Sequence, residues 1–114
     1  MNLETFYLSL SVKNIRFSKI FYEKLGFTTI PNGGSLEKKW LIMTNGKIKI
    51  GLFQDMFPNN TLTFNPPDVR AIYRQLKAEG FEMVYESESL ADAEGPCSFV
   101  IVDPDGNPIL FDQH

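Results

Sequence analysis

The sequence contains one pattern twice, with the second copy 54 residues after the first. Setting Gly26 over Gly80 brings four further pairs into line without a gap: Asn14 with Asp68, Ile15 with Val69, Arg16 with Arg70, and Phe27 with Phe81. Self-similarity at a fixed spacing is the signature of repeated structural units. It restricts the chain to folds built from two similar halves.

Each copy predicts an amphipathic helix between two capping signals. Asn14 and Asp68 are good N-caps, because their side-chain oxygens can accept hydrogen bonds from N–H groups of the first turn. Gly26 and Gly80 suit the left-handed position just past a helix C-terminus. An apolar stripe at helical spacing lies between the caps, formed by Ile15, Ile20, Phe21 and Leu25 in the first copy and by Val69, Ile72, Tyr73 and Leu76 in the second.

Short alternating or β-branched runs predict the strands. They cover residues 6–12, 27–30, 39–43 and 47–53 in the first half, and residues 61–64, 81–85, 97–102 and 109–111 in the second. Asn45-Gly46 predicts a tight hairpin turn, and residues 103–107 predict another turn, whereas the glycine-rich residues 32–35 predict a flexible loop.

The order of these elements predicts an α+β fold of two tandem βαβββ modules, residues 1–57 and 58–114. Neither half can enclose a sufficient core alone, so we expect one domain, 1–114, with curved mixed sheets around a cleft. Clefts of this kind are common sites for small ligands.

Composition excludes several classes of partner and location. The 114 residues are 43% hydrophobic, with a net charge of −3 and scattered Lys and Arg, so we expect neither nucleic acid nor an anionic membrane surface as a partner. No apolar run approaches the roughly 20 residues that cross a bilayer, and the N-terminus lacks a signal-peptide pattern. The single cysteine, Cys97, cannot form an internal disulfide. We therefore expect a cytoplasmic protein.

Three motifs resemble those of the vicinal-oxygen-chelate superfamily, which includes glyoxalase I, extradiol dioxygenases and bleomycin-resistance proteins. Residues 10–14 (LSVKN) and 21–27 (FYEKLGF) resemble the start of these proteins, and residues 102–108 (VDPDGNP) resemble their closing hairpin. The resemblance covers essentially the whole chain and implies the same fold. It does not indicate which activity is present.

The resemblance also implies where metal ligands would lie. Metal-dependent members place His or Gln on the first strand of a module and Glu on its last strand. The matching positions here are Tyr7, Thr61, Leu110, and either Ile50 or Gly51. None of these is a normal ligand for a divalent ion, and the only histidine is His114. We therefore expect no metal, no cofactor and no catalytic residue of the family's usual kind.

The leading prediction is a metal-independent small-molecule-binding protein that sequesters an antibiotic or a metabolite, rather than an enzyme. The resemblance places six residues in the ligand-binding cleft: Tyr7, Ser9, Trp40, Thr61, Thr63 and Leu110. Short members of the group commonly complete the cleft from a second chain, so we expect a homodimer. The modules could pair within one chain or be exchanged between two chains.

Two alternatives stay open. A glyoxalase I-like lyase or a dioxygenase could have recruited a metal to other carboxylates, of which Glu37, Asp55, Asp103 and Asp112 are the candidates. A protein-partner or regulatory module would instead have a filled cleft and an exposed apolar patch elsewhere.

Several single residues each allow two interpretations. Tyr7 and Thr61 could orient a ligand through their hydroxyls or be ordinary strand residues, and Trp40 could be a binding platform or part of the core. Cys97 has no histidine beside it to act as a base, so we expect a buried, inert thiol. The acidic segment 86–94 could attract a cationic drug, although a solvated loop is the simpler interpretation.

Overall fold

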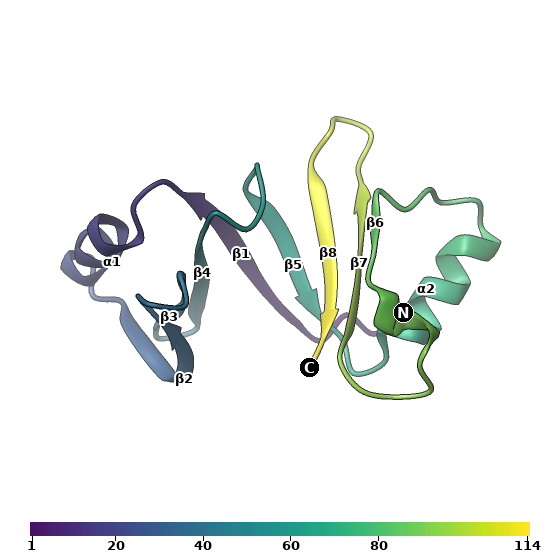
Figure 1. Cartoon of the computed structure of the whole chain (residues 1–114), viewed down its shortest axis with the longest axis horizontal. Coiled ribbons are helices and arrows are strands. Elements are labelled where there is room, and N and C mark those ends of the chain that lie inside the picture. Colours follow the sequence, from purple (N-terminus) through teal and green to yellow (C-terminus); the bar gives the residue numbers. More distant parts are fainter. The chain divides into compact units, whose positions relative to one another are not determined.

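The computed structural model describes all residues, 1–114. It divides into two compact units (Figure 1): residues Tyr7–Thr61, called here the first module, and Met1–Phe6 with Leu62–His114, the second module. Each module has one α-helix and strands in the order β-α-β-β-β. The predicted α+β class and the two βαβββ modules are confirmed.

In the first module, one helix lies between the first two strands. The elements are β1 (Thr5–Val12), α1 (Ile15–Lys24), β2 (Thr28–Ser35), β3 (Trp40–Asn45) and β4 (Ile48–Gln54). The strands are ordered β2-β3-β4-β1. Strand β1 runs parallel to β4, while β2, β3 and β4 pair antiparallel.

The second module repeats this topology. Its elements are β5 (Thr61–Asn65), α2 (Val69–Ala78), β6 (Tyr85–Glu86), a short 3₁₀ helix (Glu88–Ala91), β7 (Cys97–Val102) and β8 (Pro108–Gln113). The order β5-β8-β7-β6 matches that of the first module, with β5 parallel to β8. Its last two pairings are antiparallel.

Both helices begin at the predicted N-caps. The Asn14 carboxamide oxygen accepts a hydrogen bond from the N–H of Phe17, and the Asp68 carboxylate accepts one from Ala71. These bonds satisfy first-turn donors that have no partner within the helix. The capping signals therefore place both helix starts correctly.

A second cap comes from the last residue of a strand in each module, and the sequence patterns did not predict it. Gln54, at the end of β4, accepts a hydrogen bond from the N–H of Ile15 at 2.9 Å. Gln113, at the end of β8, accepts one from the N–H of Val69 at 2.8 Å. The two glutamines tie each helix start to the sheet beneath it.

The helix C-termini also follow the repeat. Gly26 and Gly80 have φ values of 92° and 89°, in the left-handed region that glycine adopts without steric cost. The N–H of Phe27 donates to the carbonyl of Tyr22, and Phe81 makes the equivalent bond in the second module. This is the Schellman arrangement, in which the residue after the glycine folds back on the last turn.

The core of the first module lies between α1 and one face of its sheet. Its buried members are Ile15, Leu41, Met43, Ile50 and Leu52. Partly buried side chains of β1 and of α1, Leu10, Val12 and Tyr22, pack against them.

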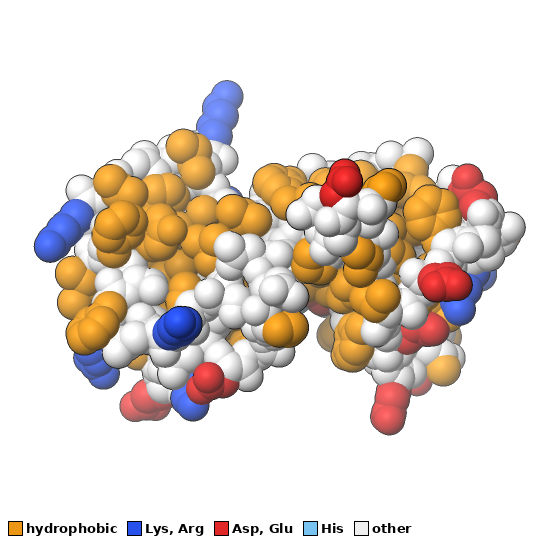
Figure 2. All heavy atoms as spheres, turned by 90° about the horizontal axis from the view of Figure 1, so that it is seen from above, with side chains coloured by type: hydrophobic (Ala, Val, Ile, Leu, Met, Phe, Trp, Pro, Cys, Tyr) orange, Lys and Arg blue, Asp and Glu red, His pale blue; other side chains and the backbone are white.

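The predicted stripe on α1 is wrong at three of its four positions. Ile20, Phe21 and Leu25 are exposed, and only Ile15 is buried. At about 100° per residue, the positions that follow Ile15 on the inner face are 18 and 22, and Tyr22 packs against the core. Figure 2 shows hydrophobic side chains on the surface of the first module.

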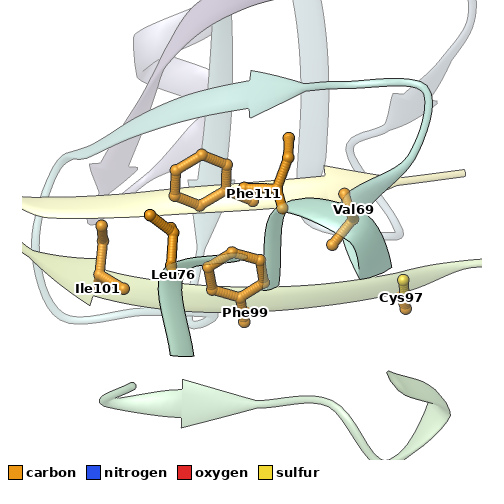
Figure 3. Packing of buried hydrophobic residues seen from close by; sticks show 7 residues of the cluster. Val69, Leu76, Cys97, Phe99, Ile101 and Phe111 are labelled. Carbon is orange, nitrogen blue, oxygen red and sulfur yellow. The ribbon is translucent and has the colours of Figure 1, made fainter. Parts of the chain in front are cut away.

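The core of the second module is built as its repeat predicts. Its buried members are Val69, Ile72, Leu76, Cys97, Phe99, Ile101 and Phe111. Phe99 and Phe111 are directly opposite each other on β7 and β8, and their rings stack with centroids 4.7 Å apart (Figure 3). Tyr73 is half-buried against this cluster, so the stripe on α2 is largely confirmed.

Two segments differ from the strand predictions. Residues 32–35 belong to β2, where a register irregularity between Thr29 and Gly34 absorbs the glycines. The strand predicted over 81–85 is wrong at four of its five residues: β6 is Tyr85–Glu86, and residues 81–84 form no strand. Neither helix is both long enough and apolar enough to cross a membrane.

Candidate functional site

Each sheet has one face against its helix and an opposite face, here called the far face. Strand side chains alternate between the two faces. Because Leu41, Met43, Ile50 and Leu52 pack toward α1, their neighbours lie on the far face of the first sheet. That face consists of Tyr7, Ser9, Ser11, Trp40, Ile42, Thr44, Lys49, Gly51 and Phe53.

Three of the six predicted cleft residues, Tyr7, Ser9 and Trp40, lie on this face. Tyr7 and Ser9 are buried and Trp40 is half-buried. Tyr7 and Ser9 both have interaction partners in the structure. Thr61 begins β5, is buried, and donates a hydrogen bond to the Asn59 carbonyl at 3.0 Å.

The other two predicted residues lie together in the second module. Thr63 and Leu110 are directly opposite each other on β5 and β8. Their neighbours Phe64 and Phe111 pack toward α2, so Thr63 and Leu110 occupy the far face of the second sheet. Asp112 lies two residues beyond Leu110, on the same face.

Gly51 lies in the middle of the far face of the first sheet, between Ser9 on β1 and Ile42 on β3. A Cβ placed on it would lie 2.5 Å from a ring carbon of Phe53 and 2.9 Å from one of Tyr7. The two rings therefore occupy the space that any side chain at position 51 would need. The φ of Gly51 is not in the left-handed region, so the backbone conformation does not require glycine at this position. Glycine is required because the two rings approach the backbone closely.

An aromatic row lies beside Gly51. Trp40 and Phe53 are paired residues on β3 and β4, and their rings stack with centroids 6.5 Å apart and planes 9° apart. Phe57 follows, with its centroid 5.1 Å from that of Phe53. All three rings are half-buried. Phe53 and Phe57 were not predicted as site residues, although Phe53 is two residues after Gly51 and therefore shares its face.

One positive charge lies on the same face. The ammonium of Lys49 is 5.1 Å from the centroid of the Tyr7 ring, within the range of a cation–π interaction. Lys49 is half-buried. The far face of the first sheet thus combines stacked aromatic rings, small hydroxyl side chains and one cation.

Comparison with solved structures relates this arrangement to a fold. A glyoxalase/bleomycin resistance protein/dioxygenase superfamily member from Vibrio splendidus 12B01 matches with a TM-score of 0.70 and 15% sequence identity, covering 96% of this chain and 98% of that chain. The chain has the glyoxalase/bleomycin-resistance/dioxygenase fold. No family model and no curated protein sequence matches it.

Other structures with this fold carry different names. A methylmalonyl-CoA epimerase from Mycobacterium tuberculosis matches with a TM-score of 0.66 and 14% identity, covering 94% of this chain and 85% of that chain. A chain described as an NAD-dependent benzaldehyde dehydrogenase from Legionella pneumophila matches with a TM-score of 0.76 and 19% identity, covering 96% and 98%. Such diversity shows that the glyoxalase/bleomycin-resistance fold does not by itself determine an activity.

The metal site that glyoxalases and dioxygenases imply does not fit the residues present. The position expected on the last strand of the second module is Leu110, which has no donor atom. In the first module it is Ile50, which packs in the core toward α1, or Gly51, whose side-chain space is filled by rings. The first-strand positions are Tyr7 and Thr61, whose neutral hydroxyls are poor ligands for divalent ions. No three His, Cys, Asp or Glu side chains lie close enough to hold a metal ion.

The carboxylates considered for a relocated metal site have other roles. Asp55 forms an ion pair with Lys39 at 3.0 Å, and this hydrogen bond lowers the pKa of Asp55. Asp103 accepts hydrogen bonds from Asn107 across the β7–β8 turn, which lower the pKa of Asp103. Glu37 is exposed.

Asp112 is the one carboxylate on a far face. Burial raises its pKa, while His114, 3.5 Å away, lowers it. When burial raises the pKa of a carboxyl, the charged form has lost more stabilisation from water than it gains from its neighbours in the folded chain. Asp112 is therefore a site of local electrostatic cost, and no second carboxylate joins it.

The acidic segment 86–94 is held in place by one arginine. The buried Arg70 guanidinium donates to the carbonyls of Ser89, Glu94 and Gly95 at 2.8 to 3.2 Å. Glu86 accepts a hydrogen bond from the hydroxyl of Tyr73, which raises the tyrosine pKa. The carboxylates of the segment are exposed, as expected for a solvated loop.

Cys97 is buried, with 3% of its surface exposed, and burial raises the pKa of its thiol. The prediction of a buried cysteine is therefore confirmed. A raised pKa means little thiolate at neutral pH, which is the reverse of what a nucleophile needs.

Proposed function

We propose that the protein is a small-molecule-binding protein that needs no metal and holds a flat, partly apolar molecule against the far face of the first sheet. The observation that carries this proposal is the Trp40–Phe53 stack beside Gly51. In a metal-dependent relative, a carboxylate ligand would lie near position 51. In this chain Gly51 has no side chain, and the rings of Tyr7 and Phe53 fill that space. The biological role that we propose is sequestration of an antibiotic or a metabolite.

The chemistry of the face favours one class of ligand. Aromatic rings stack on planar molecules in offset or edge-to-face geometry, each pair contributing about 0.5–1.5 kcal/mol beyond area burial. Lys49 adds a positive charge at the Tyr7 end of the face. A planar molecule with an acidic group therefore fits better than a cationic one.

The only tryptophan of the chain supplies a direct test. Planar aromatic acids titrated into the protein should quench or shift the fluorescence of Trp40 saturably, with one molecule bound per chain. Phe53→Ala should weaken binding about tenfold, equivalent to about 1.4 kcal/mol, and Lys49→Met should weaken binding of the acids but not of their neutral amides.

Two controls separate binding from folding. Val102→Ala removes an exposed apolar side chain from the second module and should leave the affinity unchanged. Circular dichroism should show the same secondary structure for every variant. If no planar acid binds, or if Phe53→Ala binds all of them as the natural chain does, the proposal is wrong.

The proposal includes two further statements, that the protein acts as a homodimer and that it is cytoplasmic. Its competitor, a metal-dependent lyase or dioxygenase with relocated ligands, predicts stoichiometric nickel, zinc, manganese or iron. Metal analysis of protein purified without chelator should find less than one-tenth of an equivalent of any of these. If one equivalent of metal is found per chain, and if its removal abolishes a catalytic activity, the protein is a metal-dependent enzyme instead.

One observation favours the second competitor, a module that binds a protein partner. That hypothesis predicts an exposed apolar patch away from the candidate site, and the exposed side chains of α1 form such a patch.

A further inference from the structure

The outer face of α1 carries four large hydrophobic side chains in solvent. Phe17, Ile20, Phe21 and Leu25 are 70%, 48%, 59% and 56% exposed. They recur at spacings of three and four residues, so they form one stripe on the side of the helix away from the core. This stripe is called here the α1 face.

The second module shows that its fold does not require such a face. Four residues of α2 occupy the positions that match Phe17, Ile20, Phe21 and Leu25 in the repeat: Ala71, Arg74, Gln75 and Glu79. They are small or polar, while the inner positions Val69, Ile72 and Leu76 are buried. The two helices have the same place in the same topology, but only the second module has a polar outer side on its helix. The α1 face needs an explanation beyond the core of its own module.

A groove lies beside the face and extends it. It has a volume of about 490 Å³ and lies between α1 and the end of β1. Its lining includes Leu10, Val12, Phe17 and Phe21. A hollow next to protruding rings can receive the side chains of a partner.

The charges of the two modules are opposite. The first module has eight Lys and Arg against three Asp and Glu, a net charge of +5, whereas the second has three against eleven, a net charge of −8. Around the α1 face, Lys13, Arg16 and Lys24 are exposed. An apolar stripe with a basic border fits a partner with an apolar centre and an acidic border.

Such a surface exists on the second module. The segment 79–88 exposes Phe81, Val84 and Tyr85 to 45%, 63% and 52%. Four exposed glutamates lie within it: Glu79, Glu82, Glu86 and Glu88. It includes β6, the edge strand of the second sheet, which no further strand of that sheet covers.

We propose that the α1 face of one chain binds the segment 79–88 of a second copy of the same chain. Apolar side chains meet at the centre, and Arg16 and Lys24 lie opposite glutamates at the border. In a two-fold dimer, residue i contacts j and j contacts i, so this contact forms twice. Stable interfaces bury about 800 Å² on each partner, which favours two contacts over one. The proposal does not depend on ligand binding at the far face.

Self-pairing of two α1 faces is the nearest alternative, and it places basic borders against each other. Like charges in contact oppose association, whereas the proposed pairing places opposite charges together. An anionic membrane would also attract a basic, apolar helix. These two occupants are outcomes that the experiment below distinguishes.

Cross-linking between separately tagged chains tests the proposed pairing. Ile20→Cys and Val84→Cys place one exposed thiol on each surface, and the native Cys97 is 3% exposed and does not compete. A short bis-maleimide should link the two variants when they are mixed and should link neither variant to itself. Self-linking of Ile20→Cys, or no linking in the mixture, would overturn the proposal.

Substitutions taken from the other module provide a second, independent measurement. The variant Phe17→Ala, Phe21→Gln carries the residues that α2 has at the same positions, so the helix should keep its circular dichroism and its unfolding midpoint. Sedimentation equilibrium should show at least tenfold weaker dimerisation, and the same loss for Glu82→Lys. The natural dimer should weaken as the salt concentration rises. A dimer that is unaffected by both variants, or binding of the natural chain to anionic vesicles that these variants abolish, would show that the face has another occupant.

Discussion

Gly51→Ala is the perturbation that most directly tests the geometry of the candidate site. The added methyl group would lie 2.5 Å from the Phe53 ring and 2.9 Å from the Tyr7 ring. Both distances are shorter than carbon atoms tolerate, so the rings must move. Because Gly51 lies in β4 between two paired strands, the backbone has little freedom to move instead.

The magnitude follows from two opposing effects. Overpacking of this kind costs about 1–3 kcal/mol, and replacing glycine by alanine returns about 0.4–1 kcal/mol through the unfolded chain. We expect a net destabilisation of about 1–2 kcal/mol, or roughly 4–8 °C in Tm for a domain of this size. Ligand binding at the stack should weaken as well, since the displaced Phe53 ring is part of it.

A double-mutant cycle with Phe53→Ala isolates the cause. Urea unfolding should show a smaller cost for Gly51→Ala when Phe53 is absent, since the shorter of the two contacts is then removed. Gly46→Ala is the matched control: a Cβ there meets nothing within 4 Å, so its cost should be equal in both backgrounds. An equal cost of Gly51→Ala with and without Phe53 would refute the steric explanation.

Substitutions at Arg70, Gln113 and Asp112, with their controls, and one labelling experiment test other contacts. Arg70→Met should cost about 2–3 kcal/mol and speed amide exchange in the acidic segment, because three carbonyls lose their donor, whereas Arg16→Met, at its exposed repeat counterpart, should change stability by less than about 0.5 kcal/mol. Gln113→Ala should cost about 1–2 kcal/mol in urea unfolding, because the carboxamide accepts from the N–H of Val69 and donates to the Gly95 carbonyl; Gln113→Glu keeps the acceptor but places a carboxylate oxygen against that carbonyl, so it should not recover the loss. Because burial raises the pKa of Asp112, its contribution to stability is present below the unfolded pKa and is lost as the pH rises through the folded pKa. Asp112→Asn should therefore raise the urea midpoint at pH 7 but not at pH 3, and an equal gain at both would contradict this. The buried Cys97 should react with Ellman's reagent at least about 100-fold more slowly in the folded chain than in urea, and comparable rates would show that the thiol is accessible.

Local signals predicted the helices and their topology well. Asn14, Asp68, Gly26 and Gly80 each act through hydrogen bonds or φ values within a few residues. Information of this kind is present in a short window of sequence. Because the signals occur twice at the same spacing, they also supported the order of the strands.

Contacts between distant segments were not predictable in the same way. The bond from Ile15 to Gln54 spans 39 residues, and Gln54 carries no pattern that marks it as a cap. The contact of Gly51 with the Phe53 and Tyr7 rings was missed for the same reason, although Tyr7 itself was predicted as a cleft residue. A lone glycine in a strand indicates a close approach without identifying what approaches, and only the pairing of β3 with β4 places Trp40 against Phe53.

The error on α1 was avoidable from the repeat itself. The inner positions of α2 are Val69, Ile72 and Leu76, and their counterparts in α1 are Ile15, Ser18 and Tyr22. Counting hydrophobic residues favoured Ile20 and Phe21 instead, since a sequence pattern does not distinguish a stripe that meets a core from one that meets another molecule. The division of charge between the modules was also visible in the sequence, because eight of the eleven Lys and Arg lie in residues 7–61.

Differences between the two modules are therefore more informative about function than what they share. The shared features, N-caps, glycine C-caps, strand-end glutamines and one packed face per sheet, are all required by the fold. The differences are that only the first module has stacked rings on its far face, where the second has the pair Ser98 and Asp112, and that only the first helix has an apolar outer face. In a duplicated fold, each position of one module can be compared with the matching position of the other. Exposed apolar side chains such as Phe17 and Phe21 lower solubility unless a partner covers them. Aromatic side chains on a far face can instead be covered by a ligand.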